Sequence, residues 1–397
     1  MITVDEAIAL IREHVSIPAP KNLPLQNASG KVLAQDLCAP ADLPAWPQAN
    51  MDGYAFAWTD AAFGPGAPAL ELTLCGEIPA GVAPSFGVPP GCAARIFTGA
   101  MMPAGADTVV IQERVSVSGD QVRIEDATLQ KGANVRPPGS EIPSGALALA
   151  QGTLLGPAAI GFVASLGLDK IPVYHPRVSL ITTGNELQTP GLPPAPGRVY
   201  ESNSFALRAA LEQVGIPLEA HYLAPDEPAA LTGIIREALA ASDLLLLTGG
   251  VSVGDYDFVA RSLAECGVRT VFHGVRQRPG KPLYFGVGDT PVFGLPGNPS
   301  SVLTCFYIYV LPALERMCGR TQSPVRRQHL PLDREYRKVP GLTHFLKGAA
   351  GSNAVTPLGA QESYRMSTYA LANCLIRLPE DGSVFKPGDP VDVYRLP

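Results

Sequence analysis

The sequence has few cysteines, and they are not paired. It contains seven in 397 residues, and no CxxC pair occurs among them. Zinc knuckles and disulfide frameworks both need cysteines at close or regular spacing, so neither is expected here. The seven, which we expect to be reduced thiols, are Cys38, Cys75, Cys92, Cys266, Cys305, Cys318 and Cys374.

Membrane and secretory signals are also lacking. No apolar run reaches the length needed to cross a bilayer, and no basic stretch followed by an apolar one opens the sequence. Positive charge is not in excess, because 30 Lys and Arg against 36 Asp and Glu give a net charge of -6. Neither nucleic acid nor a membrane surface is therefore expected as a partner. We expect a cytoplasmic protein that holds any anionic ligand with local groups.

The familiar nucleotide-binding signatures are missing as well. Gly280 and Lys281 are followed by Pro282 instead of Ser or Thr, and no glycine lies at the spacing of a P-loop. No GxGxxG follows an expected strand, so a dinucleotide-dependent oxidoreductase is not indicated. No internal repeat of fixed period is present.

What the sequence does have is enough apolar residues for several cores. With 46% hydrophobic residues in 397, two to four domains are expected. A capping-box pattern at Thr3–Glu6 predicts an N-terminal helix. Short strands between Pro and Gly turns predict a small all-β insert within residues 57–140, and a helix is expected at Pro157–Leu168. After a polar linker at 321–324, short strands predict a small β-barrel.

Strands and helices alternate regularly from residue 177 to about 317. The expected strands are Val178–Thr182, Leu218–Leu223, Leu244–Leu247, Val268–His273 and Pro291–Pro296. The expected helices are 203–215 with a buried stripe of Phe205, Leu207, Leu211 and Val214, then Pro228–Ala241 capped by Asp226, then 258–267, and an apolar helix from Gly297 to Met317. This order predicts a doubly wound parallel sheet with ligands at the carboxyl ends of its strands.

The candidate site begins where the apolar run Leu244–Leu247 ends in a glycine-rich loop. Gly249, Gly250 and Gly254 allow close approach of the backbone to an anion. A tight turn with solvated acids would explain this loop equally well on its own. Three further polar loops, however, leave carboxyl ends of strands in the same predicted sheet, and the four loops are 183–186, 249–257, 276–282 and 296–301.

These loops bring acids and cations together. The acids are Glu186, Asp255 and Asp257, the cations are Arg276, Arg278 and Lys281, and Ser252 and the backbone near Ser300 lie between them. One interpretation is a structural network of salt bridges. The other is a divalent cation held by carboxylates beside a phosphate or other oxyanion held by Arg, Lys and helix N-termini.

Six ordered motifs together resemble the molybdopterin molybdenumtransferase family, which includes the E domain of gephyrin. They are Asn50-Met-Asp-Gly-Tyr-Ala, Arg95-Ile-Phe-Thr-Gly-Ala with Gly105–Glu113, Thr182-Thr-Gly-Asn-Glu-Leu, Gly249-Gly-Val-Ser-Val-Gly-Asp-Tyr-Asp, Arg278-Pro-Gly-Lys-Pro and Gly294-Leu-Pro-Gly-Asn-Pro-Ser. The resemblance covers essentially the whole chain. It implies a multidomain α/β plus β fold and a homodimer whose clefts combine the α/β domain and barrel of one subunit with the insert of the other.

The resemblance implies four domains. They are an elongated mixed N-terminal domain (1–40 plus 141–172), an all-β insert (41–140), a three-layer molybdopterin-binding α/β domain with a mainly parallel sheet (173–320) and a C-terminal β-barrel (321–397). The implied reaction is the Mg2+-dependent insertion of molybdate, as a substrate, into adenylylated molybdopterin with release of AMP. Further partners implied are the molybdopterin adenylyltransferase and apo-molybdoenzymes.

The family's site residues can be carried over to this sequence. The implied catalytic residues are Asp52, Glu186, Asp226 and Asp257, of which Glu186 and Asp257 would bind the metal. The implied substrate-binding residues are Thr98, Glu141, Ser252, Arg278, Lys281, Pro296, Asn298, Pro299, Ser300, Lys347 and Ser363.

Some positions depart from the family pattern. Glu141 replaces the usual Asp, Arg278 and Gly274 stand where lysines are common, and Lys347 stands where Arg is common. Loss of the bidentate fork of Arg affects anion binding more than the reaction, and Arg276 is a candidate to replace the charge missing at Gly274.

Two alternatives remain, a catalytically silent gephyrin-like scaffold and an adenylyltransferase or pyrophosphatase that shares the α/β domain. Retention of Asp52, Glu186, Asp226 and Asp257 disfavours the scaffold, and the insert and barrel favour the transferase.

Overall fold

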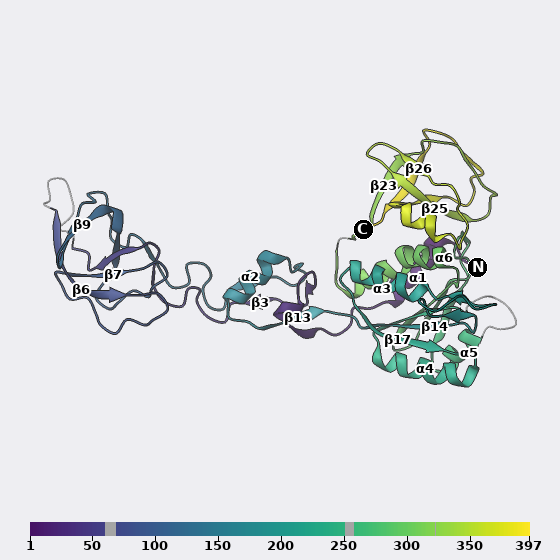
Figure 1. The fold of residues 1–397 in the computed structure, drawn as a ribbon, viewed down its shortest axis with the longest axis horizontal. Coiled ribbons are helices and arrows are strands. Elements are labelled where there is room, and N and C mark those ends of the chain that lie inside the picture. Colours follow the sequence, from purple (N-terminus) through teal and green to yellow (C-terminus); the bar gives the residue numbers. More distant parts are fainter. Residues whose placement is uncertain (60–68, 251–257, 322) are drawn as a thin grey trace. The chain divides into compact units, whose positions relative to one another are not determined.

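The computed structural model describes residues 1–59, 69–250, 258–321 and 323–397, and the chain divides into two compact units. The first unit comprises Met1–Ala34, Gly152–Gly156 and Lys170–Pro397, and the second comprises Gln35–Gln151 and Pro157–Asp169 (Figure 1). Each unit has hydrophobic cores of its own.

A six-stranded sheet is the centre of the first unit. Its order is β17 (Leu218–Ala224), β14 (Val178–Thr183), β18 (Leu244–Thr248), β22 (Pro291–Leu295), β21 (Tyr284–Val287) and β19 (Arg269–His273). The first four strands are parallel, and β21 is antiparallel to both of its neighbours. The carboxyl ends of β14, β18, β22 and β19 therefore lie at one edge of the sheet, as the sequence predicted.

Helices cover both faces of this sheet (Figure 1). One face packs against α1 (Val4–His14), α3 (Asn203–Gln213), α6 (Pro299–Cys305), a π-helical segment (Phe306–Val310) and α7 (Leu311–Met317). The other face packs against α4 (Pro228–Ala241) and α5 (Phe258–Glu265).

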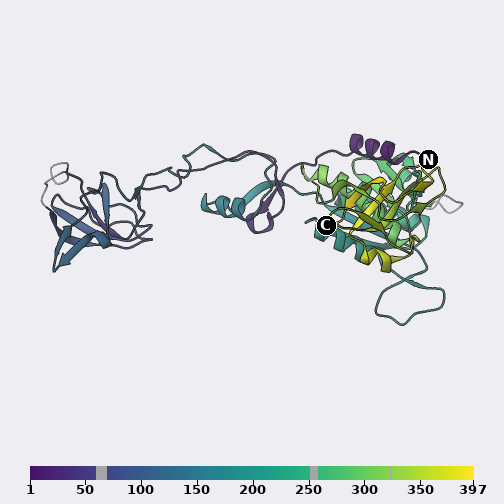
Figure 2. The ribbon, with the colours of Figure 1, turned by 90° about the horizontal axis from the view of Figure 1, so that it is seen from above.

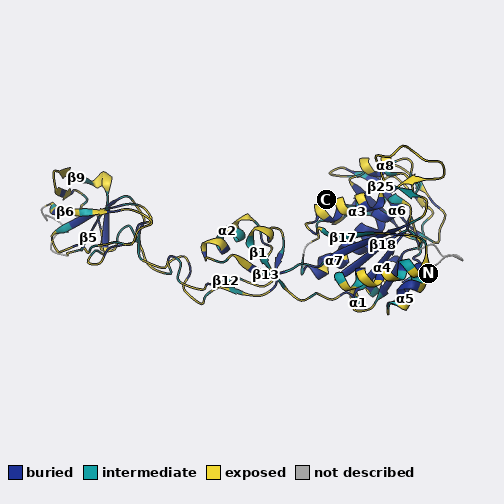
Figure 3. Cartoon of the chain, turned by 60° about the horizontal axis from the view of Figure 1, so that its bottom comes forward, coloured by how far each residue is buried: buried dark blue, intermediate teal, exposed yellow. Residues whose placement is uncertain are grey.

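The central strand β18 shows why the sheet is buried on both sides. Leu244 and Leu246 pack into the core with α3 and α7, whereas Leu245 and Leu247 pack with α4 and α5. Side chains alternate between the faces of a strand, so a continuous run of leucines fills both cores. Figure 3 shows β18 buried and the outer sides of the helices exposed.

The N-terminal helix α1 begins at the predicted capping box. Thr3 Oγ1 accepts from the Glu6 backbone N–H at 3.1 Å, and the Glu6 carboxylate accepts from the Thr3 N–H at 2.7 Å. Both bonds satisfy N–H groups that the first helical turn leaves without partners. The helix, purple in Figure 2, buries Val4, Ala7 and Ile11 against the core.

The C-terminal part of the first unit is a second sheet. Its order is β20 (Gln277–Arg278), β25 (Thr343–Ala350), β27 (Cys374–Leu378), β29 (Pro390–Arg395) and β23 (Arg326–Pro331). Smaller elements around it are β24 (Tyr336–Arg337), β26 (Val355–Pro357), α8 (Met366–Leu371) and β28 (Val384–Phe385). Strand β20 belongs to the basic loop 276–282, so this loop is hydrogen bonded to the C-terminal sheet.

Three shorter pairings complete the first unit. A three-stranded sheet joins β1 (Lys21–Pro24), β13 (Lys170–Tyr174) and β2 (Val32–Leu33), with the 3-10 turn η1 (Leu25–Asn27) between β1 and β2. A parallel pair, β15 (Leu187–Gln188) and β16 (Val199–Tyr200), follows β14.

The second unit consists largely of β structure. Its main sheet has the order β8 (Thr108–Ile111), β5 (Gly53–Phe56), β7 (Cys92–Ile96), β6 (Leu70–Ile78), β10 (Gln121–Ile124) and β9 (Val115–Ser118). The remaining elements are β3 (Leu37–Cys38), β4 (Gln48–Ala49), η3 (Gln112–Arg114), β11 (Val135–Arg136), β12 (Leu147–Leu149) and α2 (Pro157–Ser165). The strands expected for a β insert are therefore confirmed.

Two details of the predicted helices are wrong. Phe205 was expected in the buried stripe of α3, but it is 58% exposed, whereas Leu207, Leu211 and Val214 are buried. Phe205 is two residues before Leu207, and two residues turn a helix by about 200°, so it points away from the core. Asp226 does not cap α4, because the N-cap residue is Glu227 and the Asp226 carboxylate binds elsewhere.

Strand β21 was not predicted, and it is antiparallel to both of its neighbours. The sheet is therefore mainly parallel, as the family resemblance implied, and not the purely parallel sheet that the order of strands and helices suggested. The turn Gly288–Thr290 joins β21 to β22 as a hairpin. The broader expectation of a multidomain α/β plus β fold is confirmed, whereas the four domain boundaries and closure of the barrel stay predictions. Among the described residues, no helix is both long and apolar enough to span a bilayer.

Candidate functional site

The loops at the carboxyl edge of the α/β sheet enclose a cavity of about 910 Å³, which we call the cleft. A second wall comes from residues 361–364, between β26 and α8 of the C-terminal part. Predicted site residues that line it are Glu186, Arg278, Lys281, Pro296, Asn298, Pro299 and Ser363. This size and composition suit a ligand of drug or cofactor size.

Two cations of the cleft are available to a ligand. Arg278 and Lys281 are exposed, and no described residue is seen to pair with either side chain. Arg276 is different, because its guanidinium lies 3.4 Å from the Glu380 carboxylate. The expectation that Arg276 replaces the charge missing at Gly274 is therefore not supported. The cleft keeps two unpaired cations on one short loop.

Glu186 is the predicted acid that lines the cleft. Its side chain is exposed and folds back over Gly184, where a Cβ atom would lie 2.9 Å from both carboxylate oxygens. Gly184 has φ +149°, a conformation that suits glycine. No partner of the Glu186 carboxylate is seen among the described residues, so it can serve a ligand.

Asp226 lies beneath this loop and does not line the cleft. Its carboxylate accepts from the Thr183 hydroxyl and, at 3.0 Å, from the backbone N–H of Asn185. Both donors belong to the loop that ends at Glu186. Asp226 therefore holds this loop in place from the end of β17.

Ser363 connects the two walls of the cleft. Its hydroxyl accepts from the Asn298 amide at 2.9 Å, and its carbonyl accepts from the Ser300 N–H at 3.1 Å. Ser300 itself is 1% exposed and is not part of the cleft wall, and its hydroxyl has no hydrogen-bond partner among the described residues.

Lys347 was predicted to bind substrate, but its side chain does not line the cleft. It is 2% exposed, and its ammonium donates to the carbonyls of Ala360 and Glu362 at 3.1 Å and of Arg365 at 3.3 Å. Burial lowers the pKa of this ammonium below its usual range. An ammonium has three donors, so all of them are used to hold loop 360–365.

The sequence pattern offered Ser202 or Asn203 as the cap of helix 203–215. Ser202 holds the N-cap position without a side-chain bond, and Asn203 is part of the cleft wall. The Glu201 carboxylate takes the capping role, accepting from the Ser204 N–H at 2.8 Å. The Asn203 amide is left to donate to the Gly297 carbonyl at 2.9 Å, which joins α3 to the loop after β22. Polar residues at the start of a helix predict a cap. The bond from Asn203 to the loop after β22 appears only in the tertiary structure.

Several predicted residues lie outside the described residues or outside this unit. Ser252, Asp255 and Asp257 are not among the described residues. In the described parts of the chain, no group of three or more His, Cys, Asp or Glu side chains gathers as a metal site would require.

The second unit contains Asp52, Thr98 and Glu141. The Asp52 carboxylate accepts from the Thr98 N–H at 2.7 Å and from its hydroxyl at 2.6 Å. These two bonds lower the pKa of Asp52. The two residues are thus brought together as a pair, whereas their role in the cleft stays a prediction.

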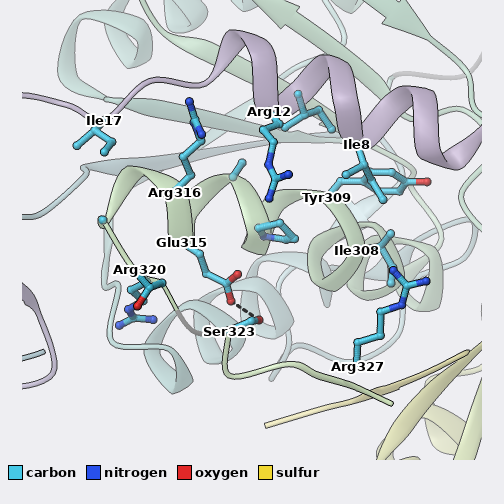
Figure 4. A pocket seen from close by; sticks show the side chains of 15 residues that line it. Ile8, Arg12, Ile17, Ile308, Tyr309, Glu315, Arg316, Arg320, Ser323 and Arg327 are labelled. Atoms are coloured by element: carbon cyan, nitrogen blue, oxygen red, sulfur yellow. Dashed lines mark hydrogen bonds between the residues drawn. The ribbon is translucent and has the colours of Figure 1, made fainter. Parts of the chain in front are cut away.

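Another cavity of the first unit, about 650 Å³, is less suited to an anion (Figure 4). It lies among α1, α7 and β23 and contains four arginines. Three of them have protein partners already, since Arg316 donates to Val15 O, Arg320 to Val214 O and Arg327 to Asp392.

Comparison with known proteins gives three family models that match nearly the whole chain. They are "MoeA N-terminal region (domain I and II)" over residues 2–167, "Probable molybdopterin binding domain" over residues 179–316, and "MoeA C-terminal region (domain IV)" over residues 329–396. A solved structure of the molybdopterin biosynthesis MoeA protein from Pyrococcus horikosii is 29% identical with a TM-score of 0.79, and the match covers 100% of this chain and 99% of that one.

Curated relatives agree with these models. A molybdopterin molybdenumtransferase from Nostoc sp. is 35% identical over 386 residues, which cover 94% of this chain and 88% of the relative. Molybdopterin molybdenumtransferase 2 of Mycobacterium tuberculosis is 33% identical over 405 residues, with 100% of both chains covered. The chain therefore belongs to the molybdopterin molybdenumtransferase family.

Proposed function

We propose that the cleft is the place where this molybdopterin molybdenumtransferase inserts molybdate into adenylylated molybdopterin and releases AMP. The observation that supports this most directly is the pair of unpaired cations, Arg278 and Lys281, facing the same cavity as the free carboxylate of Glu186. Both substrates are anions, and a protein with a net charge of -6 needs local cations to hold them.

Arg278 and Lys281 would divide this work by their chemistry. The planar guanidinium of Arg278 suits two parallel hydrogen bonds to a tetrahedral oxyanion, whereas the ammonium of Lys281 acts as a point charge. The carbonyls of Pro279 and Gly280, between the two cations, accept from the buried Gln277 amide and so do not face an anion. The organic part of the substrate would lie against the rest of the cleft wall, which includes Pro296, Asn298, Pro299 and Ser363.

The residues of the cleft fit a Mg2+ ion. Mg2+ in proteins uses one or two carboxylates together with substrate phosphates and water, and Glu186 presents a free carboxylate. We assign Glu186 and Asp257 as its protein ligands and keep Ser252 as a proposed substrate-binding residue. Asp257 and Ser252 lie outside the described residues. When bound, the ion would reduce the charge of the pyrophosphate and orient a water molecule.

The remaining predicted residues have supporting parts in this proposal. Asp226 holds the loop of Glu186, and Ser300 and Lys347 hold the loop of Ser363. In a homodimer of four-domain chains, the other subunit would supply Asp52 and Thr98 from its insert and Glu141 from the residue that directly follows the insert. The molybdopterin adenylyltransferase and apo-molybdoenzymes are proposed as partners that supply the substrate and receive the product.

The test is to incubate the purified protein with adenylylated molybdopterin, Mg2+ and molybdate, and to follow AMP. AMP release that depends on both Mg2+ and molybdate is expected. A catalytically silent scaffold would give no AMP at all. An adenylyltransferase would instead form pyrophosphate from ATP and molybdopterin, and a pyrophosphatase would release AMP without any dependence on molybdate. Any of these three results would contradict the proposal.

A further inference from the structure

The loop that carries Arg278 and Lys281 is folded around the side chain of Gln277. Gln277 is 0% exposed, and its amide nitrogen donates to the carbonyl of Pro279 at 2.9 Å and to that of Gly280 at 3.3 Å. Two backbone carbonyls of the loop are thus hydrogen bonded to the Gln277 side chain, which lies inside the loop. These bonds fix the short segment between the two cleft cations.

The other end of the Gln277 amide is bonded to a tyrosine. Its oxygen accepts from the Tyr309 hydroxyl, and Tyr309 is 1% exposed. The amide orientation follows from the chemistry, because the two backbone carbonyls can only accept and must therefore face the NH2 group. Burial raises the pKa of Tyr309 well above its usual range, so its hydroxyl keeps the proton that it donates.

The loop is closely packed on two sides. Gly280 has φ +88°, and a Cβ atom there would lie 2.5 Å from Cys305 Sγ and 2.7 Å from Gln277 Nε2. On its other side, Gln277 and Arg278 form strand β20, which pairs with Thr343 and His344 of β25. The loop is therefore held between the C-terminal sheet and the helix that follows β22.

Tyr309 belongs to the π-helical segment Phe306–Val310, which separates α6 from α7. Short π-helical turns are rare and occur often at functional sites. Tyr309 also lines the second cavity, where it lies beside Ile8 (Figure 4). Its hydroxyl donates to the Gln277 side chain.

We propose that Gln277 and Tyr309 are positioning residues that preset the Arg278–Lys281 loop for its oxyanion. Neither needs to touch the ligand; they hold the loop backbone so that both cations face the cleft before the anion arrives. Preorganisation of this kind strengthens binding because the cost of ordering the loop is already met in the free protein. The inference rests on the proposed function, which assigns the anion to this loop.

The test compares two tyrosines of the same π-helical segment. Tyr309→Phe removes only the hydroxyl that bonds Gln277. Tyr307→Phe is the matched control, because the Tyr307 hydroxyl lies 3.5 Å from Gln213 Oε1, away from the loop. Equilibrium binding of molybdate alone and the KM and kcat of AMP release are measured for both variants, with the thermal midpoint as a check on folding.

We expect Tyr309→Phe to weaken molybdate binding and raise its KM by about 3- to 10-fold, since a buried acceptor loses its donor. The kcat at saturating molybdate should change less than about twofold, because the groups that act on the substrate remain. Tyr307→Phe should match the wild type in all three measurements. Gln277→Glu should also weaken molybdate binding, since a carboxylate cannot donate to the carbonyls of Pro279 and Gly280.

The outcomes separate this inference from the proposed function. If Arg278→Ala weakens molybdate binding but Tyr309→Phe binds as tightly as Tyr307→Phe, only the positioning role is overturned. If Tyr309→Phe lowers kcat with an unchanged KM for molybdate, it is overturned as well. If Arg278→Ala also leaves molybdate binding intact, the assignment of the anion to this loop fails, and the inference fails with it.

Discussion

Arg278 and Lys281 are available to a ligand because neither is seen to pair with a described residue, whereas two other cations near the cleft are occupied. Arg276, two residues earlier, is paired with Glu380, and Lys347 is occupied by three carbonyls. A cation that lacks a protein partner keeps its full attraction for a substrate anion, and the net charge of -6 repels anions from the chain as a whole. The anion-binding function of the cleft therefore depends on two side chains rather than on a broad basic surface.

Arg278→Ala should weaken molybdate binding by roughly 10- to 150-fold, because a charge-assisted contact contributes about 1.5 to 3 kcal/mol. Salt should weaken binding in the wild type, and less steeply in the variant, since one cation fewer is screened. Arg276→Ala is the control, because its guanidinium is already paired with Glu380. Titration with molybdate at two salt concentrations measures both effects.

A different result would reassign the loop. If Arg278→Ala bound molybdate as tightly as the wild type but lost affinity for adenylylated molybdopterin, the loop would hold the organic phosphate. Molybdate would then have to bind elsewhere in the cleft, near Ser363 and Asn298.

Lys347→Met should destabilise loop 360–365 without removing a ligand contact. It leaves the carbonyls of Ala360, Glu362 and Arg365 without their donor, at a cost of about 1 to 3 kcal/mol. Urea unfolding should show this loss, and hydrogen exchange should become faster at residues 358–365. If molybdate affinity fell sharply while exchange in the loop stayed unchanged, Lys347 would contact the anion directly, as the sequence alone predicted.

At the scale of elements, β20 connects the two sheets of the first unit. It is only two residues long, yet it places Gln277 opposite Thr343 and Arg278 opposite His344. Strand β20 is part of loop 276–282, which carries Arg278 and Lys281. The pairing with β25 therefore helps to hold this loop at the cleft. The C-terminal sheet thus contributes to the site through this pairing as well as through its own loop.

The stability of the first unit should depend on pH through His344, which pairs with Arg278 between β25 and β20. Burial lowers its pKa to about 4, and the charges of Lys338 and Arg278 add to the effect. Between pH 6.5 and 4 the unfolded chain binds a proton that the folded protein excludes, so stability is lost as the pH falls through this window. The loss from this residue should be about 2 kcal/mol.

His344→Gln should reduce the dependence of the free energy of unfolding on pH between pH 6.5 and 4. Urea unfolding at pH 7, 5.5 and 4 would give the free energy of unfolding for both proteins, and the wild type should lose more of it on acidification. Parallel profiles for the two proteins would mean that His344 is not the group that titrates.

The sequence was most informative where local pattern and burial agree. The helix Pro228–Ala241 was predicted with its observed bounds, and β18 was recognised from four consecutive leucines. Both elements are long or strongly apolar, so neighbours cannot easily change them. The same patterns placed the polar loops at one edge of the sheet, which is why Arg278, Lys281 and Glu186 were found as neighbours.

What the sequence could not show depends on contacts between distant segments. Lys347 and Asp226 were read as site residues because of their type and motif, but which carbonyls or N–H groups they meet is decided by tertiary packing. Gln277 had no motif of its own, and its role appears only when Tyr309, 32 residues later, is folded against it. Strand β21 was missed because its four residues are short and lie in a Gly-containing segment between two predicted strands, and its antiparallel pairing with both of them appears only in the folded sheet.

At the scale of the whole molecule, the proposed site residues are divided between the two compact units. Asp52 and Thr98 form their own hydrogen-bonded pair in the second unit, while Glu186 and Arg278 line the cleft of the first. The bonds from Thr98 lower the carboxyl pKa of the half-buried Asp52, and Thr98 itself is exposed, so the pair is accessible to a ligand. We therefore keep the proposal that the pair serves the cleft of a second subunit in a homodimer.

Mixing two inactive variants tests this proposal. Asp52→Ala and Glu186→Ala should each abolish AMP release alone, the first through the second unit and the second through the cleft. After subunit exchange in equal amounts, about half of the dimers are mixed, and each mixed dimer has one cleft with both lesions and one with neither, so about a quarter of the wild-type activity should return. If exchange is verified, for instance with two affinity tags, and no activity returns, each cleft must be built from a single chain and the shared cleft is wrong.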